Sequence, residues 1–224
     1  MNAKILSTSY ITHDVKRFVV EKPDGYKFIP GQATLVAINT PKWKYEKRDF
    51  SFTSLNEDPQ LEFIIKAYPR NIYPNHGGVT EELHKLKEKD EITIERPYGT
   101  ISYKGLGVFI AGGAGITPFI AILRQLYKDG KLRGNKLIFS NKTSKDVILE
   151  KELRKMLADD LILVLTREEK NGYEYGRIDE EFLKKHINNF SQHFYVCGPK
   201  EMVKQIRQIL KNLGAQTDSL VFEK

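Results

Sequence analysis

The segment Val108–Leu126 constrains the fold more than any other, because it reads as a strand, a glycine turn and a helix in direct succession. The apolar run at 108–111 is typical of a buried parallel strand. Glycine and alanine fill 112–115, and Thr117 with Pro118 then favours a helix start, since threonine caps helices and proline loses only an unpaired N–H there. One apolar helix face follows, made by Phe119, Ile122, Leu123 and Leu126.

Such a turn is a candidate phosphate site, since free N–H groups and the positive end of a helix dipole point at one place. The spacing of Gly113 and Gly115 lacks the third glycine of the usual dinucleotide fingerprint, and Pro118 stands in its place. A tight turn also needs glycine for backbone reasons alone. The segment by itself leaves both interpretations open, a phosphate site and a connection without a ligand.

Composition narrows the class of protein. The 224 residues suffice for one large domain or two ordinary ones. No apolar run approaches the ~20 residues of a membrane helix, and the N-terminus lacks the apolar core of a signal peptide, so we expect no membrane insertion and a cytoplasmic location. A lone cysteine, Cys197, excludes an internal disulfide, a cysteine-ligated zinc site and a four-cysteine iron–sulfur cluster. We expect no metal.

The charge balance is positive, with 36 lysines and arginines against 29 aspartates and glutamates. The basic residues are spread along the chain, without a stripe interleaved with aromatics, which argues against nucleic-acid binding. A positive surface without such a stripe favours either ordinary solvation or an acidic protein partner.

The first part of the chain is rich in short β-prone runs bounded by turn residues. One short helix, beginning at Thr80, interrupts them. This spacing predicts a small antiparallel barrel of six strands. The expected strands are Lys4–Ile11, Lys16–Glu21, Ala33–Ile38, Arg48–Ser54, Leu61–Tyr68 and Glu91–Glu95.

After Gly105 strands and helices alternate, which predicts a doubly wound parallel sheet of about five strands. We therefore expect two domains, residues 1–104 and 105–224. The expected helices cover 118–128, 145–157, 179–187 and 199–213. The expected strands are Val108–Ala111, Lys136–Ser140, Leu161–Thr166, His193–Cys197 and Ser219–Phe222.

Two motifs in the first half suit a ligand with a phosphate and a flat ring. Arg48 and Phe50 lie two residues apart on one strand and share a face, where one grips an anion and the other stacks. The stretch Gly77–Thr80 is a second glycine-flanked helix start. Each motif alone also fits an ordinary surface arginine, a core phenylalanine and a plain turn.

Four motifs in this order resemble the ferredoxin–NADP reductase superfamily across essentially the whole chain. They are Arg48-Asp49-Phe50-Ser51, Gly77 to Thr80, Gly112 to Pro118 and Cys197-Gly198-Pro199, with Pro30-Gly31-Gln32 also in the expected place. The resemblance implies an N-terminal flavin-binding barrel and a C-terminal NAD(P)-binding α/β domain.

For the flavin, the resemblance implies that Arg48 binds phosphate, Phe50 covers the isoalloxazine ring and Ser51 approaches N5, the hydride-accepting atom. Phe50 stands where tyrosine is commonest, which keeps stacking and loses a phenolic hydrogen bond. The other implied flavin contacts are Asp49, then Ile65, Lys66 and Ala67 on the next strand, then Gly77, Gly78, Val79 and Thr80.

For the dinucleotide, the resemblance implies that Gly113, Ala114, Gly115, Thr117 and Pro118 hold the pyrophosphate. Cys197, with Gly198 and Pro199, lies near the nicotinamide and orients it without acting as a nucleophile. Asn141 and Lys142, after the second strand, contact the part that distinguishes NADPH from NADH. No acidic residue directly follows that strand, which favours NADPH.

The expected activity is a flavoprotein reductase that takes hydride from NADPH or NADH onto FAD, with FMN possible, and passes electrons to a separate acidic carrier such as flavodoxin or ferredoxin. One alternative is a flavin reductase or the reductase component of an oxygenase. Another is an electron-transfer subunit of a larger complex. A role for the terminal Phe222-Glu223-Lys224 near the flavin is a weaker expectation.

Overall fold

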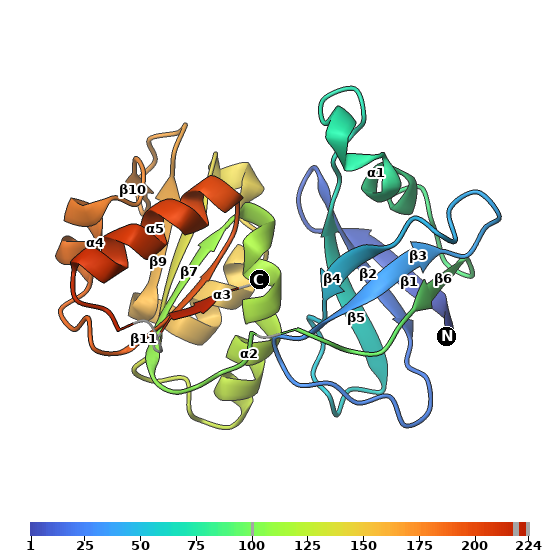
Figure 1. The fold of residues 1–224 in the computed structure, drawn as a ribbon, viewed down its shortest axis with the longest axis horizontal. Helices are drawn as coiled ribbons and strands as arrows, with labels where there is room; N and C mark the ends of the chain where they lie inside the picture. Colours follow the sequence, from blue (N-terminus) through green and yellow to red (C-terminus); the bar gives the residue numbers. More distant parts are fainter. Residues whose placement is uncertain (100, 217–219, 223–224) are drawn as a thin grey trace.

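The computed structural model describes residues 1–99, 101–216 and 220–222, which form two sheets lying side by side (Figure 1). The first sheet ends at residue 94 and the second begins at residue 107, so residues 95–106 connect them. The helix α2 (Thr117–Lys128) lies between the second sheet and the first (Figure 1). The predicted domain boundary at residue 104 falls within this connection and stays a prediction.

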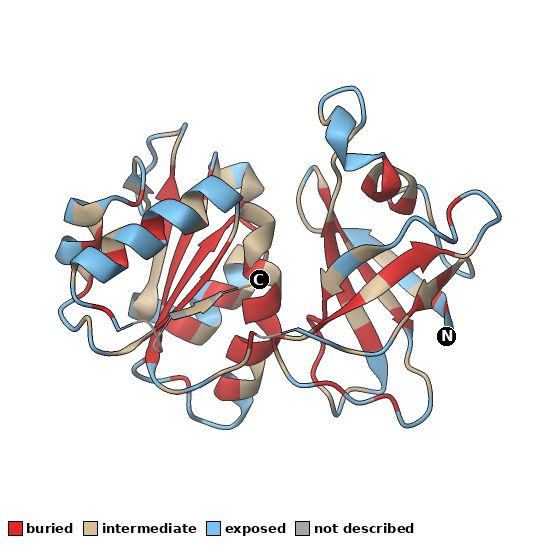
Figure 2. Ribbon diagram, in the orientation of Figure 1, coloured by how far each residue is buried: buried red, intermediate tan, exposed pale blue. Residues whose placement is uncertain are grey.

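The first sheet is antiparallel, and its strands follow the order β4-β3-β6-β1-β2-β5, which confirms the predicted six strands. Their bounds are β1 (Asn2–Tyr10), β2 (Val15–Glu21), β3 (Ala33–Ile38), β4 (Arg48–Ser51), β5 (Gln60–Lys66) and β6 (Glu91–Ile94). The edge strands meet just beyond β4, where Thr53 N–H donates to Glu62 O at 2.9 Å. Phe18, Phe52 and Phe63 fill the interior of the barrel, whose inward positions are red in Figure 2.

Strand β4 is shorter than the predicted Arg48–Ser54. Beyond Ser51 the chain changes partner, since Phe52 N–H still donates to Gln32 O while Thr53 N–H donates to Glu62 O on β5. Because the backbone of Thr53 pairs with β5, strand β4 ends before this residue. The interrupting helix is the single turn α1 (Val79–Leu83), preceded by η1 (Pro74–His76).

The second sheet is parallel throughout and has the order β10-β9-β8-β7-β11-β12. Its strands are β7 (Gly107–Gly112), β8 (Lys136–Asn141), β9 (Leu161–Leu165), β10 (Glu174–Tyr175), β11 (His193–Cys197) and β12 (Leu220–Phe222). From β7 the chain winds outward through β8 to β10, then returns to the other side of β7 as β11. The switch point of this doubly wound sheet therefore lies between β7 and β11, where ligands bind in such folds.

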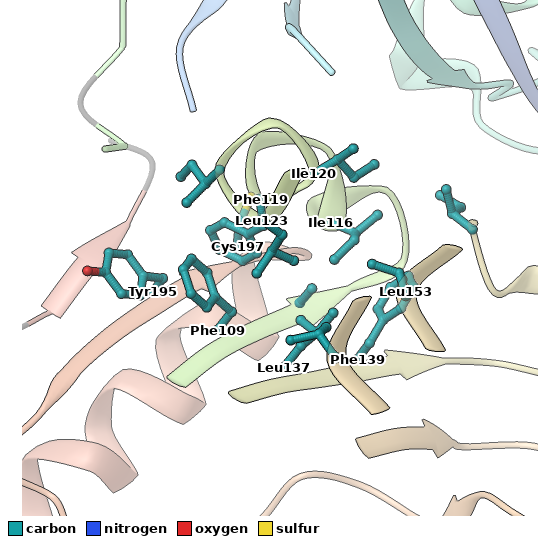
Figure 3. Close-up of a cluster of buried hydrophobic side chains, with 14 of the residues drawn as sticks. Phe109, Ile116, Phe119, Ile120, Leu123, Leu137, Phe139, Leu153, Tyr195 and Cys197 are labelled. Carbon is teal, nitrogen blue, oxygen red and sulfur yellow. The ribbon is translucent and has the colours of Figure 1, made fainter. Parts of the chain in front are cut away.

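Helices cover both faces of this sheet. Its long helices are α2, α3 (Glu150–Leu157), α4 (Glu180–His186) and α5 (Lys200–Asn212), and its short 3₁₀ turns are η2 (Gly113–Ile116), η3 (Ser144–Asp146) and η4 (Ala158–Asp160). One core packs α2 and α3 on Phe109, Leu137 and Phe139, as Figure 3 shows. The other packs α4 and α5 on Val108, Ile138 and Phe194. Among the described residues, no helix combines the length and apolarity needed to cross a membrane.

The predicted parallel sheet of about five strands is confirmed, with the two-residue β10 as an additional edge strand. One prediction for this half is corrected. The helix predicted at 145–157 is broken: η3 ends at Asp146, Val147 is extended and Leu149 has a φ of 53° before α3 begins. The break lets adjacent Val147 and Ile148 both reach the core. Of the predicted C-terminal features, Ser219, Glu223 and Lys224 lie outside the described residues.

The barrel and the α/β half share buried contacts. Val15 and Ile64 of the barrel belong to the same apolar cluster as α2. Gly31 has a φ of 100°, and a Cβ there would lie 2.6 Å from Ile101 O and 3.0 Å from the Ile122 side chain. Glycine is required at 31 because the barrel, the connection and α2 meet there.

The side-chain hydroxyl of Tyr195 holds the segment that connects the two sheets. The Tyr195 hydroxyl on β11 accepts hydrogen bonds from Lys104 N (2.8 Å) and Gly105 N (3.0 Å) and donates to Gly105 O (2.7 Å). The ring is fully buried and stacks on Phe109. Burial raises the pKa of Tyr195, so the hydroxyl stays protonated and can donate.

We predict that Tyr195→Phe lowers the free energy of unfolding by about 2–3 kcal/mol, because three backbone groups lose their partner at once. Denaturant titration followed by circular dichroism measures the loss. Tyr127→Phe, at an exposed position on α2, is the control and should change stability by less than about 0.5 kcal/mol. Equal behaviour of the two variants would contradict the anchoring role of this hydroxyl.

Candidate functional site

A cavity of about 960 Å³ lies between the barrel and the α/β sheet. Its barrel wall is built by β4, β5 and the segment that leads into α1. Its other wall is built by the carboxyl ends of β7, β8, β9 and β11 and by the start of α5. The cavity thus opens at the switch point of the parallel sheet.

Many of the residues predicted from sequence line this cavity. They are Asp49, Phe50, Ser51, Ile65, Lys66, Thr80, Gly113, Ala114, Gly115, Thr117, Pro118, Asn141, Lys142, Cys197, Gly198 and Pro199. The other predicted residues do not line it: Arg48, Ala67, Gly77, Gly78 and Val79. Two segments far apart in sequence are therefore brought face to face.

The barrel wall presents the motif on β4. Ser51 is buried beside Ala33 of β3, and Phe50 is half-buried opposite Thr34. On the next strand Lys66 Nζ lies 2.5 Å from an Asp14 carboxylate oxygen. Thr80 Oγ1 accepts from Tyr68 N at 3.0 Å, which fixes the start of α1 against the end of β5.

Two arginines converge on the glycine pair before α1. A Cβ built on Gly77 would lie 3.0 Å from the Arg48 guanidinium, and one on Gly78 would lie 2.6 Å from that of Arg70. Arg70 Nη2 also donates to Gly77 O at 2.9 Å. Gly78 and Arg70 line a second hollow of about 530 Å³, together with Glu81 and Glu82. The pattern of positive charge on a backbone turn suits an anion.

The glycine turn after β7 differs from the prediction in one detail. Thr117 does not cap α2, because η2 runs directly into the helix and Thr117 Oγ1 donates to Ala114 O at 3.0 Å. A Cβ on Gly115 would lie 2.5 Å from Cys197 O, whereas one on Gly113 would meet nothing within 4 Å. The turn is packed against β11 on one side and open on the other.

Asn141, at the end of β8, carries a buried side-chain amide. Its side chain is 5% exposed and lines the cavity. Within the part of the chain that the structure describes, neither Nδ2 nor Oδ1 has a hydrogen-bond partner. Buried polar groups are nearly always paired, so this amide is positioned for a polar group that the protein itself does not supply.

Charged side chains line the cavity beyond Asn141, at what we call its rim. Lys142 and Arg177 line the cavity near the ends of β8 and β10, and neutral Thr166 lines it after β9, the strand between those two in the sheet. Asp146 is also in the lining, and its carboxylate accepts from Thr143 N (2.8 Å) and Oγ1 (2.6 Å). Burial opposes ionisation, but these bonds and nearby Lys66 and His13 lower the pKa of Asp146 below its usual value.

Cys197 ends β11 in the apolar cluster of Figure 3 and borders the cavity at 6% exposure. Gly198 and Pro199 follow, and α5 then begins without a side-chain cap, with Lys200 and Glu201 in the cavity wall. The uncapped N–H groups of this first turn therefore lie at the site.

Sequence reasoning missed several lining residues. Tyr68, Tyr73 and His76 form one aromatic group, in which Tyr68 and His76 stack at 4.3 Å between ring centroids. Burial raises the pKa of Tyr68, which keeps its phenol neutral. The clustering of three aromatics within nine residues was the available signal. Arg177 and Gln205 carried none, because only the fold brings them to the sheet edge.

Comparisons with known proteins divide the chain as the two sheets do. Residues 2–103 match the family described as the oxidoreductase FAD-binding domain. Residues 109–208 match the oxidoreductase NAD-binding domain. Both halves of the cavity therefore belong to recognised ligand-binding domains.

The relatives are reductases or parts of them. The chain is 31% identical over 242 residues to NADH-cytochrome b5 reductase 2-A of Vanderwaltozyma polyspora, covering 94% of this chain and 79% of that protein. It is 29% identical to NADH nitrate reductase 1 of Phaseolus vulgaris, covering 98% of this chain but 28% of the relative. The chain thus spans little more than a quarter of the nitrate reductases it matches.

A solved structure agrees in fold. The flavohaem-like FAD/NAD-binding domain of nitric oxide dioxygenase from Vibrio cholerae superposes with a TM-score of 0.89 over 99% of this chain and 97% of that one. Sequence identity is 22%, so this likeness supports the fold alone.

We predict that Asp146→Ala lowers the free energy of unfolding by about 1–2 kcal/mol at pH 7, because Thr143 loses its capping partner. A lowered folded-state pKa stabilises the fold above the unfolded value of 3.8 and loses that contribution as pH falls through the folded value. The gap between variant and parent should therefore narrow below about pH 4. Urea titrations at pH 7 and pH 3 measure it, with the exposed Asp159→Ala as control. A gap that widens in acid would contradict this assignment.

Proposed function

Because the chain belongs to the oxidoreductases that join an FAD-binding to an NAD-binding domain, the ferredoxin–NADP reductase superfamily, we propose that it moves hydride from NAD(P)H to FAD and then electrons to a separate acceptor. One observation carries this proposal: the β4 motif and the glycine turn after β7 line the same cavity. Ligands held on the two walls meet within it.

The barrel wall fits the flavin. Phe50 is half-buried and faces the cavity, which suits stacking on a flat ring, and Ser51 stands next to it with a hydroxyl for a ring nitrogen. Arg48 lies against Gly77, so its guanidinium and the turn before α1 are placed to share the flavin's phosphates. We assign the phosphate-binding role to Arg48, Gly77 and Gly78, with Arg70 as an additional partner.

The other wall fits the nicotinamide dinucleotide. Gly113 exposes its backbone to open space, and the partnerless Asn141 amide supplies a donor and an acceptor to a ribose or base. The uncapped start of α5 favours a phosphate or carboxamide oxygen nearby. Cys197, packed under α2, is placed to hold the nicotinamide by contact.

The reaction needs orientation more than acid or base chemistry. When bound, the flavin supplies a hydride acceptor at N5 and can release electrons one at a time. Phe50 and Cys197 would hold the two rings from opposite walls, and the Ser51 hydroxyl would hydrogen-bond the edge of the flavin that accepts hydride. Correct placement alone can supply about 7–11 kcal/mol of the barrier.

NADPH is the donor that the rim favours. Lys142 and Arg177 offer two cations to a 2′-phosphate, and Thr166 places no carboxylate between them. Asp146, the acidic lining residue that follows β8, accepts a hydrogen bond from the Thr143 hydroxyl, and its Oδ1 lies 3.9 Å from His13 Nε2.

The acceptor that we propose is an acidic electron carrier such as flavodoxin or ferredoxin, because the chain carries a net charge of +7. The relative from Vanderwaltozyma polyspora is named for cytochrome b5, and another relative, 26% identical over 93% of this chain, is the reductase component of propane 2-monooxygenase from Rhodococcus jostii. A haem protein or an oxygenase component is therefore the second candidate. A rate with flavodoxin that falls steeply with salt would favour the first.

The proposal predicts a yellow protein whose flavin absorbance bleaches on anaerobic addition of NADPH, faster than with NADH. Absorbance at about 450 nm is recorded in a stopped-flow instrument for both donors. A protein that takes up neither FAD nor FMN would contradict the flavin site. A yellow protein that neither donor bleaches would contradict the hydride step.

We further predict that Arg48→Met weakens FAD binding about 10–100-fold, because charge-assisted hydrogen bonds to phosphate contribute about 1.5–3 kcal/mol. Equilibrium dialysis of the apoprotein with FAD measures the dissociation constant. Lys47→Met is the matched control, since Lys47 is the preceding cation and pairs with Glu95 at the surface. Equal affinities of the two variants would remove Arg48 from the site.

A further inference from the structure

One guanidinium joins the two walls of the site away from the cavity itself. Arg124 on α2 binds Glu152 of α3 through two bonds, Nε at 2.6 Å and Nη2 at 3.0 Å. Its Nη1 crosses to the barrel, where it donates to Glu62 Oε1 and to Thr53 O, both at 2.7 Å. Arg124 does not line the cavity.

The residues that Arg124 joins carry the site on each side. Thr53 follows Ser51 by two residues, and Glu62 precedes Ile65 on β5 by three. On the other side, Arg124 lies seven residues after Thr117, about 10 Å along the helix that follows the glycine turn. The guanidinium thus links the helix of the dinucleotide wall to β5 and to the segment that follows β4.

The cluster is largely removed from water. The exposed fractions of the side chains are 18% for Arg124, 16% for Glu62 and 32% for Glu152. Burial alone would lower the pKa of Arg124, but the bonds to Glu152 and the attraction of Glu62 raise it above its usual value, so the charge is permanent. Arg17 Nε lies 3.2 Å from the other Glu62 oxygen and steadies that carboxylate.

Such a cluster fixes the relative orientation of the elements it joins as well as holding them together. The guanidinium is planar, and its bonds fix the orientation of whatever they join. A second cross-pair one turn further on, Lys128 with Glu57 at 2.5 Å, is exposed by 55% and 44% and has a flexible ammonium. Exposed pairs of that kind contribute little to stability or geometry.

We propose that Arg124 is a positioning residue, which sets the separation and angle between the nicotinamide and flavin rings by fixing α2 to Thr53 and Glu62. This rests on the proposed hydride transfer. Ring placement is sensitive, because a displacement of about 1 Å can slow a reaction about 100-fold. Arg124 does not line the cavity, so its loss should change ring placement while the proposed contacts that bind each ligand remain.

The test compares Arg124→Met with the parent protein, both loaded with FAD. Four quantities are measured: FAD content, the dissociation constant of NADP⁺ from difference spectra, the bleaching rate at saturating NADPH, and the long-wavelength absorbance of the stacked nicotinamide and flavin. We expect the first two to change less than about threefold, bleaching to slow about 10–100-fold and the long-wavelength band to fall.

Small-angle scattering of the FAD-loaded protein before NADPH is added gives a readout independent of activity. We expect a larger radius of gyration for Arg124→Met, because the walls are no longer tied at this point. Lys128→Met is the matched control on the same helix and should match the parent in every measurement. If the parent itself does not bleach, the proposed function fails while the scattering result still decides whether Arg124 ties the walls.

Two further variants separate positioning from general stability. Glu62→Gln weakens the link across the interface by removing the charge that faces Arg124, whereas Glu152→Gln weakens a bond within the α/β half, so we expect only the first to slow bleaching more than about threefold. If Arg124→Met does not retain FAD, the bleaching rates of Glu62→Gln and Glu152→Gln test the positioning role instead. A parental bleaching rate and band in Arg124→Met, or equal effects of the two glutamate variants, would overturn the proposal whatever happens to the melting temperature.

Discussion

The close approach between the glycine turn and the end of β11 is the contact on which the rest of the site depends. Any side chain at position 115 would meet Cys197 O at 2.5 Å, so the turn can pack there only as bare backbone. That packing places η2, Cys197 and the start of α5 at one edge of the sheet. Because β7 and β11 are neighbours on either side of the switch point, the edge is concave, and the barrel closes it from the other side.

The two halves contribute different kinds of order to the site. The barrel holds the β4 motif on short antiparallel strands, whereas the parallel sheet collects residues from several distant segments at its carboxyl edge. Neither half encloses a ligand by itself. The relation between them is set by buried apolar contacts of Val15 and Ile64, by the glycine contact at Gly31, and by the charged cluster around Arg124. The apolar contacts hold the two halves together, and in our proposal the charged cluster fixes the angle between them.

Much of this arrangement could be predicted from sequence, because strand-forming runs and glycine turns are local signals. The bounds of Ala33–Ile38 and His193–Cys197 agree with β3 and β11. The errors arose where tertiary contacts outweigh local pattern. Apolar residues at 147 and 148 fit a helix, yet burying both in the core breaks it. Threonine is a residue type that often caps helices, yet Thr117 does not cap α2, because the 3₁₀ turn η2 runs directly into that helix. Arg70 and Arg124 have no recognisable role in the sequence, because only the fold supplies their hydrogen-bond partners, and only the fold brings Arg177 to the cavity.

The buried amide of Asn141 has a consequence for the empty protein. Burying an amide without a partner raises the free energy of the folded state, and a leucine of similar size would avoid that cost. The ligand-free fold is thus less stable at this position than its packing permits. The role proposed for Asn141 in nucleotide binding therefore has a cost in the stability of the empty protein, and a nucleotide that paired with the amide would remove that cost.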